Sequence, residues 1–218
     1  MKEIMSRRSI RKYTAEAVAD ADLQQIVESA RLAPSGSNTQ PTRFLIVRDE
    51  DVKRKIVMAD HEQEWMMTAP VFIVCAVDIA CRNKQYNGPL DETDGSFELK
   101  QVIRDGAIAV EHLALEAEHL GLGTCWTAWF KQSKMRAAVD APKGYFIVAV
   151  LTLGVPAETP AARPREEFRG QFASSQPDHS GGKFQFVDFL DQGLIGQESI
   201  GRQAVVPTAR TGGNLGPG

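Results

Sequence analysis

Four cations lie close together near the start of the chain, although the protein carries a formal net charge of −3. Arg7, Arg8, Arg11 and Lys12 are interrupted only by Ser9 and Ile10 in the stretch RRSIRK. Guanidinium groups bind phosphate oxygens in a fork, and a serine hydroxyl adds a neutral donor. A solvated basic surface is the simpler alternative, because such clusters are common on proteins. The stretch by itself therefore indicates an anion site or an ordinary surface.

A second stretch with chemical potential is APSGSNTQP, at residues 33–41. Its small residues would let the backbone approach a flat ligand, and Gly36 removes the steric limit on φ. Ser35, Asn38 and Gln40 offer side-chain hydrogen bonds. The alternative is a plain loop between a helix and a strand.

The third stretch is LGVPAETPAARPR, at residues 153–165, where an apolar strand gives way to prolines. Arg163 and Arg165 stand two residues apart, so in an extended segment both guanidinium groups point to the same side. Two such groups repel each other unless an anion lies between them. A proline-stiffened linker with solvated charges is the alternative.

The amino-acid composition indicates a globular protein and argues against nucleic-acid-binding and membrane proteins. The chain has 218 residues, of which 43% are hydrophobic and 24% charged, as in an ordinary globular protein with one core or two small ones. Its near-neutral charge gives no general attraction to nucleic acid, and no apolar run reaches the roughly 20 residues of a membrane helix. Three cysteines in non-motif spacing suit a reducing compartment. We therefore expect a cytoplasmic protein without nucleic-acid or membrane partners.

The helices and strands that position these stretches are predicted from the spacing of hydrophobic residues and from the glycine and proline residues that interrupt it. Their mixed order indicates a layered α+β or α/β domain. The longest helix is apolar on more than one face, which indicates two neighbours, one of which could be another subunit. The spacing predicts helices over 19–31, 51–58, 97–120 and 132–139, strands over 43–47, 71–77 and 145–154, and a loop over 83–96.

Together the motifs are more specific than any one of them. RRSxR, PSGxNxQP, LGLGTCW and GxPAExPxxRPR, in this order and over residues 3–168, resemble the nitroreductase family of FMN-dependent oxidoreductases. The resemblance implies an α+β three-layer sandwich, with a central, mostly antiparallel sheet flanked by helices, in an intertwined homodimer. It further implies an FMN-binding domain over residues 1–170. Residues 171–218 would then be a C-terminal extension, part ordered arm and part loose tail.

The resemblance also assigns roles to residues. Arg7, Arg8 and Ser9 would close around the FMN phosphate with Arg165, helped by Arg163, while Arg11 would lie at the pyrimidine edge of the flavin. The loop at 34–38 would reach the flavin from the second subunit, and 126–128 would run along the ring with a backbone N–H facing N5. The expected FMN-binding residues are Arg7, Arg8, Ser9, Arg11, Pro34, Ser35, Gly36, Asn38, Trp126, Thr127, Ala128, Arg163 and Arg165. His61, Gln63 and Glu64 are further candidates.

The activity implied is electron transfer from NADH or NADPH, through flavin N5, to a small oxidised acceptor in the same pocket. Nitroaromatics and quinones are the expected acceptors. No catalytic side chain and no metal ligand is assigned, because the flavin carries the chemistry. Two alternatives stay open: an FMN storage or sensor protein without turnover, and a flavin enzyme of the same fold acting on an enone or a cofactor precursor.

Overall fold

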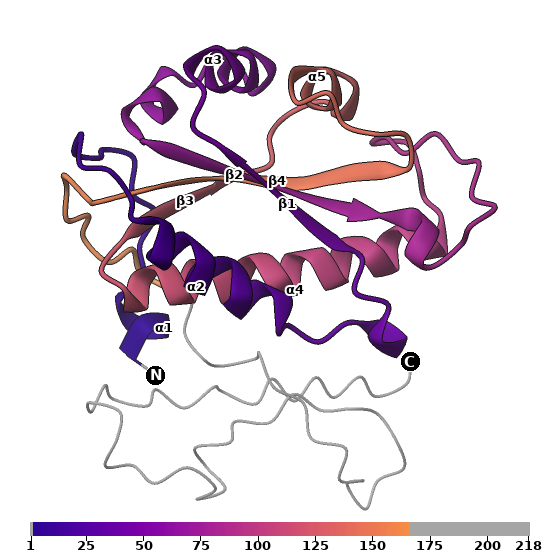
Figure 1. The fold of residues 1–218 in the computed structure, drawn as a ribbon, viewed down its shortest axis with the longest axis horizontal. Helices are drawn as coiled ribbons and strands as arrows, with labels where there is room; N and C mark the ends of the chain where they lie inside the picture. The colour runs from indigo at the N-terminus through magenta and orange to yellow at the C-terminus, as the bar shows by residue number, and fades with distance from the viewer. Residues whose placement is uncertain (1, 166–218) are drawn as a thin grey trace, which may run out of the picture. The chain divides into compact units, whose positions relative to one another are not determined.

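The computed structural model describes residues 2–165 (Figure 1). Contacts along the chain divide it into two compact units, Met1–Ala162 and Arg163–Gly218, so only the first is described as a fold. The boundary expected near residue 170 and the apolar segment at 183–190 lie outside the described residues and stay predictions.

The first unit is built on an antiparallel sheet of four strands within the described residues. Its order is β1-β2-β4-β3, so β2 and β4 are the central strands and are almost entirely buried. This confirms the expectation that the apolar runs at 71–77 and 145–154 form the centre of the sheet. The strands are β1 (Thr42–Val47), β2 (Val71–Asp78), β3 (Gly123–Thr127) and β4 (Tyr145–Gly154).

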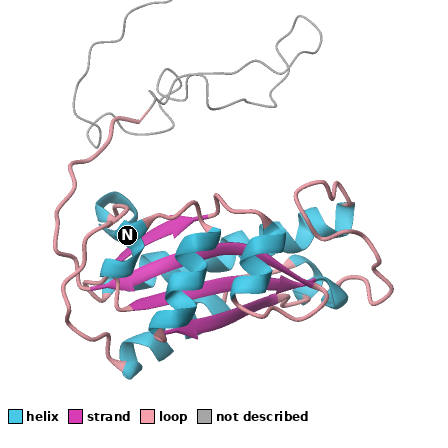
Figure 2. Cartoon of the chain, turned by 90° about the horizontal axis from the view of Figure 1, so that it is seen from above, coloured by secondary structure: helices cyan, strands magenta, loops and turns pink. Residues whose placement is uncertain are grey.

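Helices cover both faces of the sheet and make three layers. Helices α2 (Asp20–Arg31) and α4 (Phe97–His119) lie on one face, and α3 (Glu50–Ala59) and α5 (Gln132–Ala138) lie on the other (Figure 1). Seen from above, the helices cross over the strands (Figure 2). Each face has its own apolar core against the sheet. The predicted α+β three-layer sandwich is confirmed for this unit.

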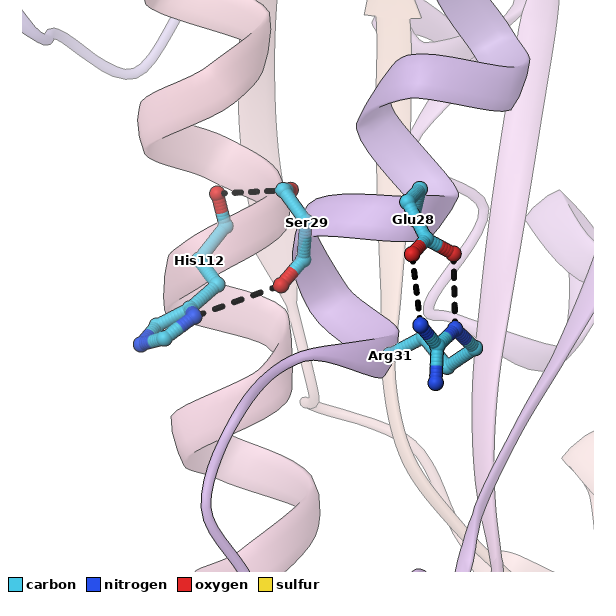
Figure 3. A network of polar contacts seen from close by, with 4 residues as sticks. All are labelled: Glu28, Ser29, Arg31 and His112. Atoms are coloured by element: carbon cyan, nitrogen blue, oxygen red, sulfur yellow. Dashed lines mark hydrogen bonds and ion pairs between the residues drawn. The ribbon is translucent and has the colours of Figure 1, made fainter.

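Helix α4 forms the middle of one outer layer. Its first turn is capped by Ser96, whose hydroxyl accepts a hydrogen bond from the Leu99 N–H. It packs along α2, where Ser29 and His112 exchange two hydrogen bonds, both 3.3 Å long (Figure 3). At Gly106 it comes so close to the sheet that a Cβ atom would lie 2.7 Å from Val77 Cγ1.

The segment before α2 is fixed against the end of the sheet. The Ile10 N–H donates to the Thr124 carbonyl, and the Thr14 N–H to the Val155 carbonyl, both at 2.9 Å. The buried Tyr13 hydroxyl lies 2.7 Å from Thr152 Oγ1 and donates to the Ile10 carbonyl at 2.6 Å. The short helix α1 (Lys2–Ser6) precedes this segment. None of the helices in residues 2–165 is long and apolar enough to cross a membrane.

Candidate functional site

The RRSxR stretch lies at the edge of the sheet formed by β3. Ser9 forms a parallel bridge with Thr124, the second residue of β3. The backbone N–H of Arg11 donates to Glu158 Oε1 at 2.5 Å, which ties the stretch to the segment leaving β4. The structure thus joins the first sequence motif to the PAE part of the third. Glu158 was missed as a site residue, although the motif GxPAExP contains it.

The cations of this stretch differ in what they contact. Arg8 Nη1 donates to the carbonyls of Met5, Ser6 and Arg7 at 2.8, 3.0 and 2.9 Å, so this part of its guanidinium closes the end of α1. The guanidinium groups of Arg7 and Arg11 have no hydrogen-bond partner among residues 2–165.

Both of these cations act on Cys125, which lies in β3. Burial raises the pKa of the Cys125 thiol, and a hydrogen bond with Ser9 and the charges of Arg11 and Arg7 oppose that rise. Arg7 and Arg11, whose guanidinium groups have no hydrogen-bond partner among residues 2–165, therefore flank Ser9 in the segment that pairs with β3. This arrangement fits a phosphate group, which needs donors and positive charge.

An aromatic surface begins directly beside Arg11. Its guanidinium carbon lies 5.6 Å from the centroid of the Trp65 ring, within the range of a cation–π contact. Trp65 lies in the turn η2 (Glu64–Thr68), which follows α3 in the chain. Trp65 was not predicted as a site residue; its signal in the sequence is a single tryptophan in the polar stretch HEQEW.

Of the three further candidates, Gln63 lies at this surface. Its side-chain amide donates to Thr127 Oγ1 at 3.3 Å, and its carbonyl oxygen accepts from the Trp65 indole N–H at 3.1 Å. Glu64 instead pairs with Arg54 at 2.7 Å in solvent. His61 stacks on Trp129, with ring centroids 3.9 Å apart.

The predicted ring segment, residues 126–128, forms the end of β3 and its exit. Trp126 leaves 39% of its surface exposed, whereas Thr127 is buried and held by Gln63. Ala128 is exposed. Ser9, Arg11 and the end of β3 therefore share one edge of the sheet, together with Gln63 and Trp65.

The loop at residues 34–38, the second predicted group, lies away from the edge of the sheet formed by β3. Gly36 is held on both sides: its N–H points at both Asp105 carboxylate oxygens at 3.2 Å, and its carbonyl accepts from Arg82 Nη1 at 3.4 Å. Ser37 and Asn38 both have φ of 54°, in the left-handed region. The loop borders a hollow of about 290 Å³ between α2, α4 and β1.

The two groups occupy opposite ends and opposite edges of the sheet. The loop at 34–38 leads into β1, where the Pro41 carbonyl accepts from the Asp78 N–H at the end of β2. Ser9 lies beside β3 at the other edge, where Gly123 pairs with Gly154 at the end of β4. In Figure 1 the loop after α2 is at the right and β3 at the left. Within the described part of one chain, the loop at 34–38 therefore lies away from Ser9, Arg11 and residues 126–128.

The late arginines, Arg163 and Arg165, are both exposed. They begin the second compact unit, so their predicted pairing with Arg7 across the phosphate stays a prediction.

Comparison with known proteins gives a consistent result. The model of the Nitroreductase family matches residues 4–65 and 57–155. An FMN reductase [NAD(P)H] of Bacillus subtilis is 31% identical over 171 residues, covering 76% of this chain and 69% of the relative. The solved structure of NfrA2 from B. megaterium is 29% identical with a TM-score of 0.69, covering 82% of this chain and 75% of that one. A Desulfovibrio desulfuricans protein of nitroreductase type, solved in complex with FMN, is 28% identical with a TM-score of 0.64, covering 75% and 90%.

Proposed function

The chain belongs to the nitroreductase family, and on this basis we propose that it is an NAD(P)H-dependent FMN oxidoreductase. Its acceptor would be a small, oxidised, conjugated molecule such as a nitroaromatic or a quinone. When bound, FMN supplies the redox chemistry by carrying electrons from the nicotinamide to that acceptor. The relatives named as FMN reductases and the neighbour solved with FMN support the cofactor and the electron donor.

One observation carries the proposal: Arg11 lies over the Trp65 ring, and neither its guanidinium group nor that of Arg7 has a hydrogen-bond partner among residues 2–165. A phosphate would be held by Arg7 with the Ser9 hydroxyl, as forked donors hold an oxyanion. Arg11 would lie between the phosphate side and Trp65, where its charge favours the electron-rich form of a bound flavin.

The remaining residues of this edge orient a planar ligand and need not exchange protons with it. Gln63 offers amide donors, and Trp65 and Trp126 offer flat apolar area. The backbone at 126–128 would supply the N–H that faces the ring. The residues present therefore fit FMN by charge and by donor set.

We further propose that two chains form the complete site in a homodimer. The loop at 34–38 and the edge with Ser9 and Arg11 are separated along and across the sheet. In a symmetric dimer, the loop of one chain can complete the edge of the other, so that two equivalent sites form at the interface. The apolar surface left exposed at Ile108 on α4 and Leu45 on β1 supports such an interface.

The test is the absorbance spectrum of the purified chain, followed by NADH and NADPH oxidation with a panel of quinones and nitroaromatics. We expect a flavin spectrum and turnover whose double-reciprocal plots are parallel, as for a two-stage transfer in one pocket. A yellow protein that oxidises neither nicotinamide with any acceptor would favour the storage or sensor alternative. A colourless protein that takes up no FMN from solution would contradict the proposal.

A further inference from the structure

The carboxylate of Asp60 is buried in an unfavourable position next to the candidate site. The residue is fully buried, and its Oδ2 accepts a hydrogen bond of 2.5 Å from the Thr127 hydroxyl. Its Oδ1 is buried without a hydrogen-bond partner in the described part of the chain. Asp60 also ends α3, where the helix dipole disfavours negative charge. An apolar or amide side chain would be less costly there, so the carboxylate requires an explanation.

The backbone that follows Asp60 is strained as well. His61 and Glu62 have φ values of 56° and 55°, in the left-handed region that residues with a Cβ atom rarely adopt. The Glu62 N–H donates to the Val57 carbonyl at 2.9 Å, which fixes this turn at the end of α3. Strained backbone persists where the surroundings impose it, and it concentrates at functional sites. Here the two strained residues immediately precede Gln63 and Trp65 in the chain.

The hydrogen bonds from Asp60 run in one direction. The Thr127 hydroxyl donates its only proton to Asp60, so its oxygen is left to accept from the Gln63 side-chain amide. The Trp65 indole N–H, which can only donate, holds the Gln63 carbonyl oxygen, and the Gln63 NH₂ group therefore faces Thr127. The series ends under the Arg11 guanidinium. Because the Thr127 oxygen accepts from Gln63, the Thr127 hydroxyl proton needs an acceptor elsewhere, and Asp60 supplies it.

We propose that Asp60 is a positioning residue: through Thr127 it fixes the Gln63 amide and the Trp65 ring at the surface that receives FMN. The inference rests on the proposed function, because it names that surface as the flavin site. Asp60 itself is too deeply buried to touch the ligand, and its role is to keep the site ordered before FMN binds. The buried carboxylate destabilises the fold, but it keeps the binding surface ordered before FMN binds.

The experiment compares full-length Asp60→Asn with the wild type, both freed of FMN and titrated with it. An asparagine can offer either an oxygen or an NH₂ group to Thr127, so the direction of the series is lost. We expect FMN affinity to fall about tenfold or more. The Trp65 indole N–H, followed by NMR, should exchange faster in the flavin-free variant. The midpoint of thermal unfolding should stay equal or rise, since an isolated buried charge is removed.

Three further variants make the test specific. Thr127→Val removes the hydroxyl at nearly constant shape and should reproduce the loss of FMN affinity, whereas Thr127→Ser keeps the hydroxyl and should restore most of it. Asp51→Asn removes an exposed carboxylate from the same helix and should leave the FMN affinity unchanged.

The outcomes separate this inference from the proposed function. A wild-type chain that binds no FMN contradicts the proposed function. A wild type that binds FMN, with Asp60→Asn binding it equally well, overturns the inference alone. If Asp60→Asn does not fold, Thr127→Val decides, and normal FMN affinity with unchanged Trp65 exchange in that variant overturns it.

Discussion

At the scale of single residues, the Arg7 guanidinium has no hydrogen-bond partner among residues 2–165, and we propose that it binds the FMN phosphate. We predict that Arg7→Ala weakens FMN binding by about 1.5–3 kcal/mol, the range for a hydrogen bond to a charged group. Arg165→Ala should have a similar effect if the late arginine shares the phosphate. The measurement is fluorescence titration of the flavin-free protein with FMN.

Lys12 provides the matched control for Arg7. It is an exposed cation in the same segment, and among residues 2–165 its side chain makes no hydrogen bond or ion pair, while its backbone carbonyl accepts from the Ala157 N–H. Lys12→Ala should therefore bind FMN like the wild type. Equal losses in Lys12→Ala and Arg7→Ala would show that the segment attracts FMN by general charge alone.

The buried carboxylate of Asp60 predicts a pH dependence of stability. Burial raises its pKa above the usual value near 3.8, although Thr127, Gln63 and His61 act in the opposite direction. The folded chain therefore binds this proton more readily than the unfolded chain does, so protonation favours folding. The free energy of unfolding of the wild type, relative to Asp60→Asn, should rise as the pH falls from neutral through the raised pKa.

Thermal unfolding of both proteins between pH 7 and pH 4 measures this difference. Taking the difference cancels the contributions of carboxylates such as Glu28 and Asp94, whose pKa values are lowered and whose effect has the opposite sign. A difference that is constant with pH would contradict the raised pKa of Asp60.

At the scale of elements, hydrophobic spacing predicted the central strands and the longer helices closely. The predicted strand at 145–154 coincides with β4, and the predicted helix at 97–120 ends one residue beyond α4. These elements carry their own signal, because each buries a regular apolar pattern. Strand β3 was not predicted, since GTCWT is too short to show a period and depends on pairing with β4. The short helix α1 was also missed.

Helix α4 can approach the sheet only because position 106 lacks a side chain. Gly106→Ala should destabilise the fold by about 1–3 kcal/mol, as overpacking does, although alanine is the better helix former. The physical reason is the contact of an added Cβ with Val77 at 2.7 Å and with Val148 at 3.0 Å. Chemical denaturation measures the free energy of unfolding.

Gly95→Ala is the control for Gly106→Ala, because an added Cβ at Gly95 meets no atom within 4 Å. It should leave the stability nearly unchanged. A Gly106→Ala protein as stable as the Gly95→Ala protein would mean that α4 can move away from the sheet without loss.

At the scale of the whole molecule, the sequence motifs predicted candidate site residues but not how the chain arranges them. Ser9, Arg11 and Thr127 lie along one edge of the sheet, and their contact with FMN stays a prediction. Asp60 and Trp65 were not predicted, because their importance arises only when the turn after α3 meets β3. No local pattern reports such a contact between distant segments.

The separation of the two site groups predicts how mixed dimers behave. Arg7→Ala damages the edge group. Gly36→Val damages the loop group, because its side chain would displace the Arg82 guanidinium, whose Nη1 donates to the Gly36 carbonyl. Each variant alone should bind FMN poorly. Co-expressed with different tags and purified as mixed dimers, the two should bind about half the FMN of the wild type, since one of the two sites then carries no substitution.

Sites built within single chains would give a different result. Every site of a mixed dimer would then carry one substitution, and FMN binding would stay as poor as in the parent variants. Such a result would contradict the shared site.

The hydrogen bond between the Arg11 N–H and Glu158 spans 147 positions of the chain. Ser9 and Tyr13 likewise pair with residues made much later, Thr124 and Pro156. During synthesis at about 5–20 residues per second, the RRSxR stretch therefore waits roughly 7–30 seconds for its partners to be made. The edge that would hold the phosphate is among the first segments translated and among the last to be fixed, so cofactor loading is expected to follow release of the finished domain.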